Sequence, residues 1–169
     1  MQFQQFQNLA FAVTSPAAYD RSNDRPGEFE QFVAISIALT GFSHAELLST
    51  GLVESYFDEL ALTVGRRIRT VFLGTVAVDP PCALSLDRWR PLGQNLIRMW
   101  YVGQWQRLPS SWAQDNFDAE ELKEYNEFSR DINRVISPTA YQEGLVWRAI
   151  GVNPPGAKQP GFASWTRRL

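Results

Sequence analysis

The sequence has a single cysteine, Cys82, and a single histidine, His44. One cysteine cannot form a disulfide within the chain, so the fold does not depend on one. Structural zinc sites, iron–sulfur clusters and di-iron bundles each need several Cys, His or Glu-x-x-His ligands, which this composition does not supply. A Ser-His-Asp or Cys-His device could use only His44, which follows Ser43 at an expected helix start. Resident metals and histidine-based catalysis are therefore not expected.

The sequence also lacks an excess of charge of one sign. A formal net charge of -2 over 169 residues gives no basis for binding nucleic acid or an anionic membrane. No stretch approaches the roughly 20 apolar residues of a membrane-spanning helix. The first residues, Met-Gln-Phe-Gln-Gln-Phe-Gln, contain no basic or continuously apolar segment, so as given they are not expected to be a secretory signal.

The short motifs of several enzyme classes are missing as well. There is no Gly-x-Gly-x-x-Gly fingerprint, Walker A loop, Gly-x-Ser-x-Gly elbow or Ser-x-x-Lys pair. One segment of the sequence contains a cluster of acidic residues, at Glu120, Glu121, Glu124, Glu127 and Asp131. A general acid and base in this cluster would need burial to separate their pKa values, whereas a solvated helix face beside Lys123 and Arg130 is the favoured interpretation.

What the sequence does contain is helical periodicity. Apolar residues at helical spacing predict a helix over residues 28–40 that stops at Gly41. Ser43 followed by Glu46 is a capping box, so a second helix is expected to begin there and to run through Gly51 or restart beyond it.

The next segments follow the same period. Beyond Gly65 the apolar face continues until Asp79-Pro80-Pro81 ends it, and this stretch is expected to be helical, although Val and Thr also allow a strand near 68–78. A further helix is expected over residues 87–105, with Pro91 near its start. Asp118 and Glu121 form a second capping pair.

The helix that this pair opens is predicted to run to Ile136. Ser137 and Pro138 then mark the start of a last helix over residues 139–150, which ends at Gly151.

The predicted fold is all-α, with five or six helices in an irregular bundle and extended arms at both ends. The arms are residues 1–27 and 152–169, and the helical domain is 28–151. The C-terminal tail combines prolines with aromatic residues, which predicts a fixed extended path. Such a tail packs either on its own helices or on another protein, and the residues alone favour neither. Trp100 and Tyr101 also allow two interpretations, a sugar-stacking platform or, favoured by their helical spacing, part of the core.

Four segments carry a resemblance to a known family: Phe29-Glu-Gln-Phe-Val-Ala-Ile-Ser-Ile-Ala-Leu-Thr-Gly41, Leu96-Ile-Arg-Met-Trp-Tyr-Val-Gly103, Tyr141-Gln-Glu-Gly-Leu145, and Pro160-Gly-Phe162 with Trp165. In their order along the chain they resemble the small (gamma) subunit of bacterial membrane-bound FAD-dependent sugar and polyol dehydrogenases, of the glucose, fructose, sorbitol and glucoside 3-dehydrogenase type. The resemblance covers roughly residues 28–60, 94–105 and 138–165.

This resemblance implies a non-catalytic subunit that binds and stabilises a larger flavoprotein and helps it to mature or to be exported. The partner is of the glucose-methanol-choline oxidoreductase class. It holds the FAD and often an iron–sulfur cluster, and a cytochrome c subunit frequently accepts the electrons. This chain is expected to bind no cofactor. Its expected partner-binding residues are Trp100, Tyr101, Tyr141, Pro154, Pro155, Pro160, Gly161, Phe162 and Trp165.

The sequence departs from the family pattern in three places. The resemblance implies the periplasm, but no twin-arginine leader is evident, so the cytoplasm is the alternative. The stretch shortly before the Pro-Gly-aromatic motif, Val152 to Gln159, contains no cysteine, so a covalent link to the partner is not expected. Trp165 is also displaced from that motif, because Ala-Ser follows Phe162. Two other functions stay open: a self-contained helical sugar-active enzyme that uses the acidic helix with Trp100 and Tyr101, and a free helical chaperone or regulatory module.

Overall fold

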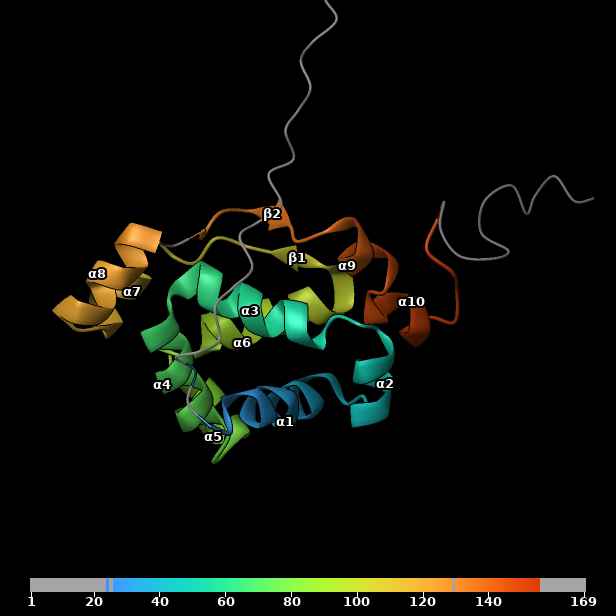
Figure 1. The fold of residues 1–169 in the computed structure, drawn as a ribbon, viewed down its shortest axis with the longest axis horizontal. Coiled ribbons are helices and arrows are strands. Elements are labelled where there is room, and N and C mark those ends of the chain that lie inside the picture. Colours follow the sequence, from blue (N-terminus) through green and yellow to red (C-terminus); the bar gives the residue numbers. More distant parts are fainter. Residues whose placement is uncertain (1–23, 25, 129, 156–169) are drawn as a thin grey trace, which may run out of the picture.

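The computed structural model describes residues 24, 26–128 and 130–155, and this part of the chain is mostly helical, which confirms the predicted fold class (Figure 1). Its helices are α1 (Glu28–Thr40), α2 (His44–Ser49), α3 (Val53–Val64), α4 (Arg66–Val76), α5 (Pro80–Ser85), α6 (Arg90–Val102), α7 (Trp112–Asn116), α8 (Ala119–Phe128), α9 (Pro138–Gln142) and α10 (Leu145–Ala149). Two short strands, β1 (Gln104–Trp105) and β2 (Arg134–Val135), pair antiparallel, with Gln104 opposite Val135.

The first two helices end and begin where the sequence predicts. Gly41 takes a left-handed conformation (φ 74°), and its N–H donates to the Ile37 carbonyl, which ends α1. The capping box at the start of α2 is formed in both directions. The Ser43 N–H donates to Glu46 Oε2 at 2.8 Å, and the Glu46 N–H donates to Ser43 Oγ at 3.4 Å.

The middle of the chain resolves two open predictions. A new helix, α3, begins beyond Gly51, so α2 does not run through that residue. Residues 66–76 form helix α4 and not a strand. Helix α5 was missed by the sequence interpretation, although Asp79 accepts a hydrogen bond from the Cys82 N–H and Pro80 occupies the first helical position, which are both helix-start signals.

The predicted helix from residue 118 to Ile136 is wrong in its second half. Helix α8 ends at Phe128, and the chain turns into β2 instead. The Asp131 carboxylate accepts hydrogen bonds from the Leu108 N–H (3.0 Å) and from Trp105 Nε1–H (2.8 Å), which ties this segment to the chain that follows α6. Long-range bonds of this kind outweigh the local periodicity that favoured a longer helix.

The expected helix over residues 139–150 is likewise divided. It consists of α9 and α10, and the break lies at Glu143 and Gly144. Helix α6 is also shorter than the predicted 87–105, because it begins at Arg90 and ends at Val102, where Gly103 follows with φ 65°.

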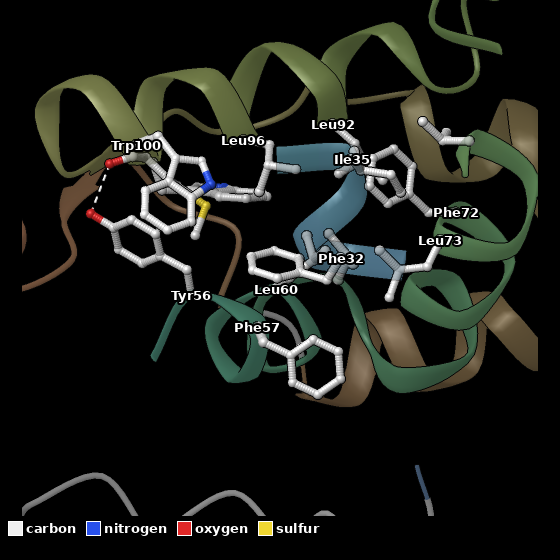
Figure 2. Packing of buried hydrophobic residues seen from close by; sticks show 14 of the residues in the cluster. Phe32, Ile35, Tyr56, Phe57, Leu60, Phe72, Leu73, Leu92, Leu96 and Trp100 are labelled. Atoms are coloured by element: carbon white, nitrogen blue, oxygen red, sulfur yellow. Dashed lines mark hydrogen bonds between the residues drawn. The ribbon is translucent and has the colours of Figure 1, made fainter. Parts of the chain in front are cut away.

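The core lies among α1, α3, α4 and α6 (Figure 2). Tyr56 and Trp100 meet edge to face with their ring centroids 4.9 Å apart. The Tyr56 hydroxyl donates to the Met99 carbonyl at 2.8 Å, and burial raises the pKa of Tyr56 above its ordinary value. Each fully buried large side chain contributes about 1.5–3 kcal/mol relative to an exposed one.

The start of the described chain is fixed to this core by ion pairs. Arg69 is fully buried and donates to Glu28 Oε2 at 2.7 Å and to Asp24 Oδ1. Its guanidinium carbon lies 4.1 Å from the centroid of the Phe57 ring, and the second Glu28 oxygen accepts from the Thr70 hydroxyl at 2.6 Å. These contacts hold the N-terminus of α1 against α4.

Candidate functional site

Three of the four segments that carry the family resemblance meet at one end of the molecule. The C-terminal half of α1 packs against the C-terminal half of α6, and α9 and α10 pack on the other side of α6. Trp100 Nε1–H donates to Ser36 Oγ at 3.0 Å, and the Tyr101 hydroxyl donates to the Thr40 carbonyl at 3.0 Å. These two hydrogen bonds join the first two segments directly.

Two glycines allow the third segment to join them. A Cβ atom added at Gly103 would lie 2.6 Å from the Ala140 carbonyl carbon, and one added at Gly144 would lie 2.7 Å from the Tyr101 carbonyl oxygen. The backbones of α6 and of the α9–α10 segment therefore approach each other more closely than any side chain would allow. Leu145, the first residue of α10, is fully buried beside this contact.

The expected partner-binding residues occupy very different environments. Trp100 is fully buried and offers no surface to a partner, because its indole lies in the core. Tyr101 is half-buried. Tyr141 is 39% exposed, Pro154 is buried and Pro155 is exposed. The remaining expected residues lie outside the described part of the chain: Pro160, Gly161, Phe162 and Trp165.

Tyr141 is one of several partly or largely exposed apolar side chains on and after α9 and α10. Its ring meets that of Trp147 edge to face at 5.4 Å, and Trp147 Nε1–H donates to the Tyr141 carbonyl at 2.7 Å. The Val152 N–H donates to the Trp147 carbonyl at 3.0 Å, and Ile150 and Val152 are 60% and 50% exposed. We call these four residues, Tyr141, Trp147, Ile150 and Val152, the α9–α10 surface.

A neighbouring helix extends this surface. Arg148 donates to Ser49 Oγ at 2.8 Å and to the Glu46 carbonyl at 3.3 Å, which places α10 beside α2. Leu48 of α2 is also about half-exposed. Sequence reasoning did not single out Leu48, Trp147 or Ile150. The available signal was the pair of apolar residues on either side of Gly151, at a helix end where the chain comes to the surface.

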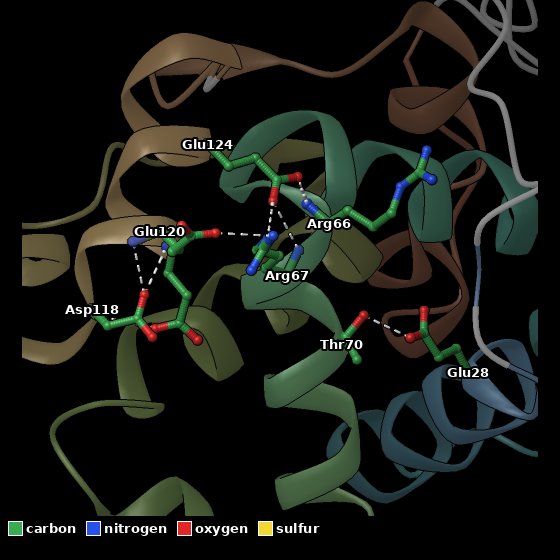
Figure 3. Close-up of polar contacts among 8 residues, drawn as sticks. Glu28, Arg66, Arg67, Thr70, Asp118, Glu120 and Glu124 are labelled. Carbon is green, nitrogen blue, oxygen red and sulfur yellow. Dashed lines mark hydrogen bonds and ion pairs between the residues drawn. The ribbon is translucent and has the colours of Figure 1, made fainter.

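The acidic cluster has structural roles at the opposite end of the molecule (Figure 3). The Arg66 N–H donates to Glu124 Oε1 at 2.6 Å and the Arg67 N–H to Glu124 Oε2 at 3.3 Å, so Glu124 of α8 satisfies donors at the N-terminus of α4. Arg67 also pairs with the exposed Glu120 at 3.2 Å. A carboxylate in this position complements the partial positive charge of a helix N-terminus.

Glu121 belongs to a local cap as well. The Asp118 N–H donates to Glu121 Oε2 at 3.1 Å, and Asp118 Oδ1 accepts from the Glu120 and Glu121 N–H groups at 2.9 Å. The structure therefore does not bring the acidic helix together with Trp100 and Tyr101, because α8 lies at one end of the molecule and α9 and α10 at the other (Figure 1).

The best-formed hollows on the described part of the chain are shallow. One, of about 280 Å³, lies between the start of α6 and α7 and is lined partly by Asp87, Arg90 and Trp112. The other, of about 260 Å³, lies between α6 and the segment after β1. The first hollow is also lined by a second carboxylate, Asp115, whereas no Asp or Glu lines the second.

Other single features carry no site geometry. His44 and Cys82 are both exposed, on α2 and α5. Among the described residues no three His, Cys, Asp or Glu side chains form a group that could hold a metal ion. No helix within the described residues is long and apolar enough to cross a membrane.

Comparison with known proteins adds no assignment. No family model matches the chain, and no significant match is found among curated proteins or solved structures.

Proposed function

We propose that this chain is a non-catalytic small subunit that binds and stabilises the FAD-containing catalytic subunit of a sugar dehydrogenase complex. In this proposal the chain holds no cofactor, and the flavin subunit supplies the chemistry. The sequence resemblance names the partner, and a first supporting observation comes from the structure: the segments of the resemblance that it describes form a single packed unit.

That unit consists of the ends of α1 and α6 with α9 and α10. Ser36 with Trp100, and Thr40 with Tyr101, join segments that are more than sixty residues apart in the sequence. Residues of one packing unit are expected to lie in contact, and these do. The resemblance is therefore consistent with a shared fold and not only with scattered similar residues.

The α9–α10 surface supports a binding role. Tyr141, Trp147, Ile150 and Val152 place aromatic and aliphatic area beside the point at which the described chain ends, at Pro155. Interfaces are enriched in aromatic residues at their centres, and a cluster of this kind gains stability when a partner covers it. We place the contact with the flavin subunit here.

The test is co-purification of the tagged full-length chain from cells that also express a candidate flavin subunit. We expect a stable complex with a flavin absorbance spectrum and with sugar-dependent reduction of an artificial electron acceptor. The isolated chain should show neither property. A chain that remains a well-behaved monomer and retains no flavoprotein would contradict the proposal.

Surface variants refine the test. Ile150→Ser with Val152→Ser should weaken the complex by roughly tenfold to a hundredfold, since covering a large aliphatic side chain contributes about 1.5–3 kcal/mol. Val78→Ser, on an 85% exposed residue after α4, is the matched control and should leave binding unchanged. Release of the chain once the flavin subunit has matured would favour the chaperone alternative, and sugar turnover by the isolated chain would favour the enzyme alternative.

A further inference from the structure

The hollow between α6 and the segment that follows β1 has a charge that is unusual for this protein. Residues 88–114 contain four arginines and no Asp or Glu, whereas the whole chain has a net charge of -2. Arg98, from α6, and Arg107, from the segment after β1, both line this hollow. The remaining lining residues are Pro91, Gln94, Asn95, Gln106, Leu108 and Pro109.

These two arginines differ from the others in this stretch. Arg90 pairs with Asp87 at 2.8 Å, and Arg88 lies 3.9 Å from Glu121. Within the described residues, the exposed side chains of Arg98 and Arg107 take part in no hydrogen bond or ion pair. Two cationic groups from separate elements therefore face one hollow without a carboxylate of their own.

The walls of the hollow are fixed in place. Asn95, which is almost fully buried, donates from Nδ2 to the Gln106 carbonyl at 2.9 Å and accepts from the Gln106 N–H at 2.8 Å. On the far side, Asp131 accepts from the Leu108 N–H, and Asn133 Oδ1 accepts from the Arg107 N–H at 2.7 Å. Three side chains, one from α6 and two from the segment between α8 and β2, thus hold the segment after β1 at a set distance from α6, so little ordering is needed on binding.

We infer that Arg98 and Arg107 bind an Asp or Glu side chain of the partner protein, so that this hollow is a second docking point on the flavin subunit. Arginine matches a carboxylate with two parallel N–H donors, and Gln94 and Gln106 add neutral donors nearby. The open hollow of about 260 Å³ is below the usual size of a pocket that buries a metabolite, but it admits one acidic side chain. The identity of the partner rests on the proposed function, whereas the carboxylate chemistry rests on the arginines.

The first arm of the test uses the purified chain and a decaglutamate peptide as the probe. Arg98→Gln combined with Arg107→Gln should weaken peptide binding by roughly tenfold or more, as expected for loss of a charge-assisted pair. The control combines Lys123→Gln with Arg130→Gln, which removes the same charge from exposed positions that do not line the hollow, and should leave binding unchanged. Equal loss in both variants, or displacement of the peptide by an equal concentration of inorganic phosphate, would overturn the inference.

The second arm uses the complex with the flavin subunit. The arginine variant should slow association and reduce its salt dependence, while the flavin spectrum of the assembled complex stays unchanged. A complex that forms normally with the arginine variant overturns the second docking point and leaves the proposed function intact. If no flavin subunit binds the wild-type chain, the proposed function fails, and the peptide arm alone decides whether the hollow takes carboxylates.

Discussion

Substituting four glycines by alanine tests directly how α6 packs against the α9–α10 segment. The four differ in whether an added side chain meets a left-handed backbone conformation, a close neighbour, both or neither. Gly103 has φ 65° and an added Cβ would lie 2.6 Å from the Ala140 backbone. Gly41 has φ 74° with open space around it, and Gly144 has an ordinary φ with the Tyr101 carbonyl oxygen only 2.7 Å away. Gly74, inside α4, has neither constraint.

The expected magnitudes follow from these two causes. A left-handed conformation costs an alanine roughly 1–2 kcal/mol, so Gly41→Ala should lose that amount. Overpacking typically costs about 1–3 kcal/mol, which we expect for Gly144→Ala. Gly103→Ala combines both causes and should lose about 2–5 kcal/mol, a large part of a typical total stability of roughly 5–15 kcal/mol. Gly74→Ala should be neutral or gain up to about 1 kcal/mol, because alanine favours a helix interior.

Urea-induced unfolding followed by tryptophan fluorescence measures this series, with the flavin complex used if the isolated chain aggregates. At this chain length each kcal/mol also corresponds to roughly 2–4 °C in Tm, so Gly103→Ala should melt roughly 4–20 °C lower. Equal losses for Gly103→Ala and Gly41→Ala would refute the close approach of Gly103 to Ala140. A neutral Gly144→Ala would refute the contact between Gly144 and Tyr101.

Three further predictions concern polar groups. Glu124→Ala should lower the free energy of unfolding in urea by about 1–3 kcal/mol, because the first N–H groups of α4 lose their acceptor. The exposed control Glu127→Ala should stay within about 0.5 kcal/mol of wild type. Equal effects of the two variants would show that Glu124 does not cap α4. Arg69→Met should lower the free energy of unfolding by about 3–5 kcal/mol, since it leaves the buried Glu28 carboxylate without this partner. Adding Glu28→Gln to this variant should recover part of the loss. If the second substitution instead adds its own full loss, the pairing is contradicted. Hydrogen bonds from the Ser43 hydroxyl and N–H hold the pKa of Glu46 below its ordinary value of 4.5, so its charge stabilises the fold above pH 4.5 and this benefit is lost as the pH falls through the lower folded pKa. The Tm difference between wild type and Glu46→Gln should therefore shrink as the pH falls through that range. A Tm difference that does not depend on pH would contradict this prediction.

Helix boundaries were predictable where a local signal sets them. Gly41 and the Ser43–Glu46 capping box depend on residues within a few positions of each other, and the structure has them as expected. Asp79 before Pro80 was an equally local signal for α5 that the sequence interpretation read as a stop. Boundaries set by distant residues could not be predicted in this way.

The segment around Asp131 is the clearest example of a distant cause. Its apolar neighbours Ile132 and Val135 continue the helical period of α8, yet both are more than half exposed. The Asp131 carboxylate bonds instead to groups more than twenty residues earlier in the chain, at Trp105 and Leu108. No window of local sequence contains both partners, so periodicity alone favoured a helix.

The candidate surface shows the same division. Tyr141 was expected at a partner interface and is exposed, but Trp100, from an equally suggestive motif, is completely buried. A helical stripe of aromatic residues marks one packed face, and the sequence does not state whether the core or a partner packs on it. Only the arrangement of α1 around α6 shows which of the two covers Trp100.

Whether an aromatic or aliphatic residue is buried or exposed determines which variants can test the proposed function. Trp100→Ala would remove a large core side chain and its hydrogen bond to Ser36, with an expected cost of about 3–5 kcal/mol, so it would reduce partner binding even if the indole never meets a partner. Ile150 and Val152 are exposed beside α10, so their replacement by serine should leave the free chain folded and change only what covers them. A loss of flavoprotein binding from the exposed residues, at unchanged Tm of the free chain, is therefore informative about the interface, whereas the same loss from Trp100→Ala is informative only about the fold.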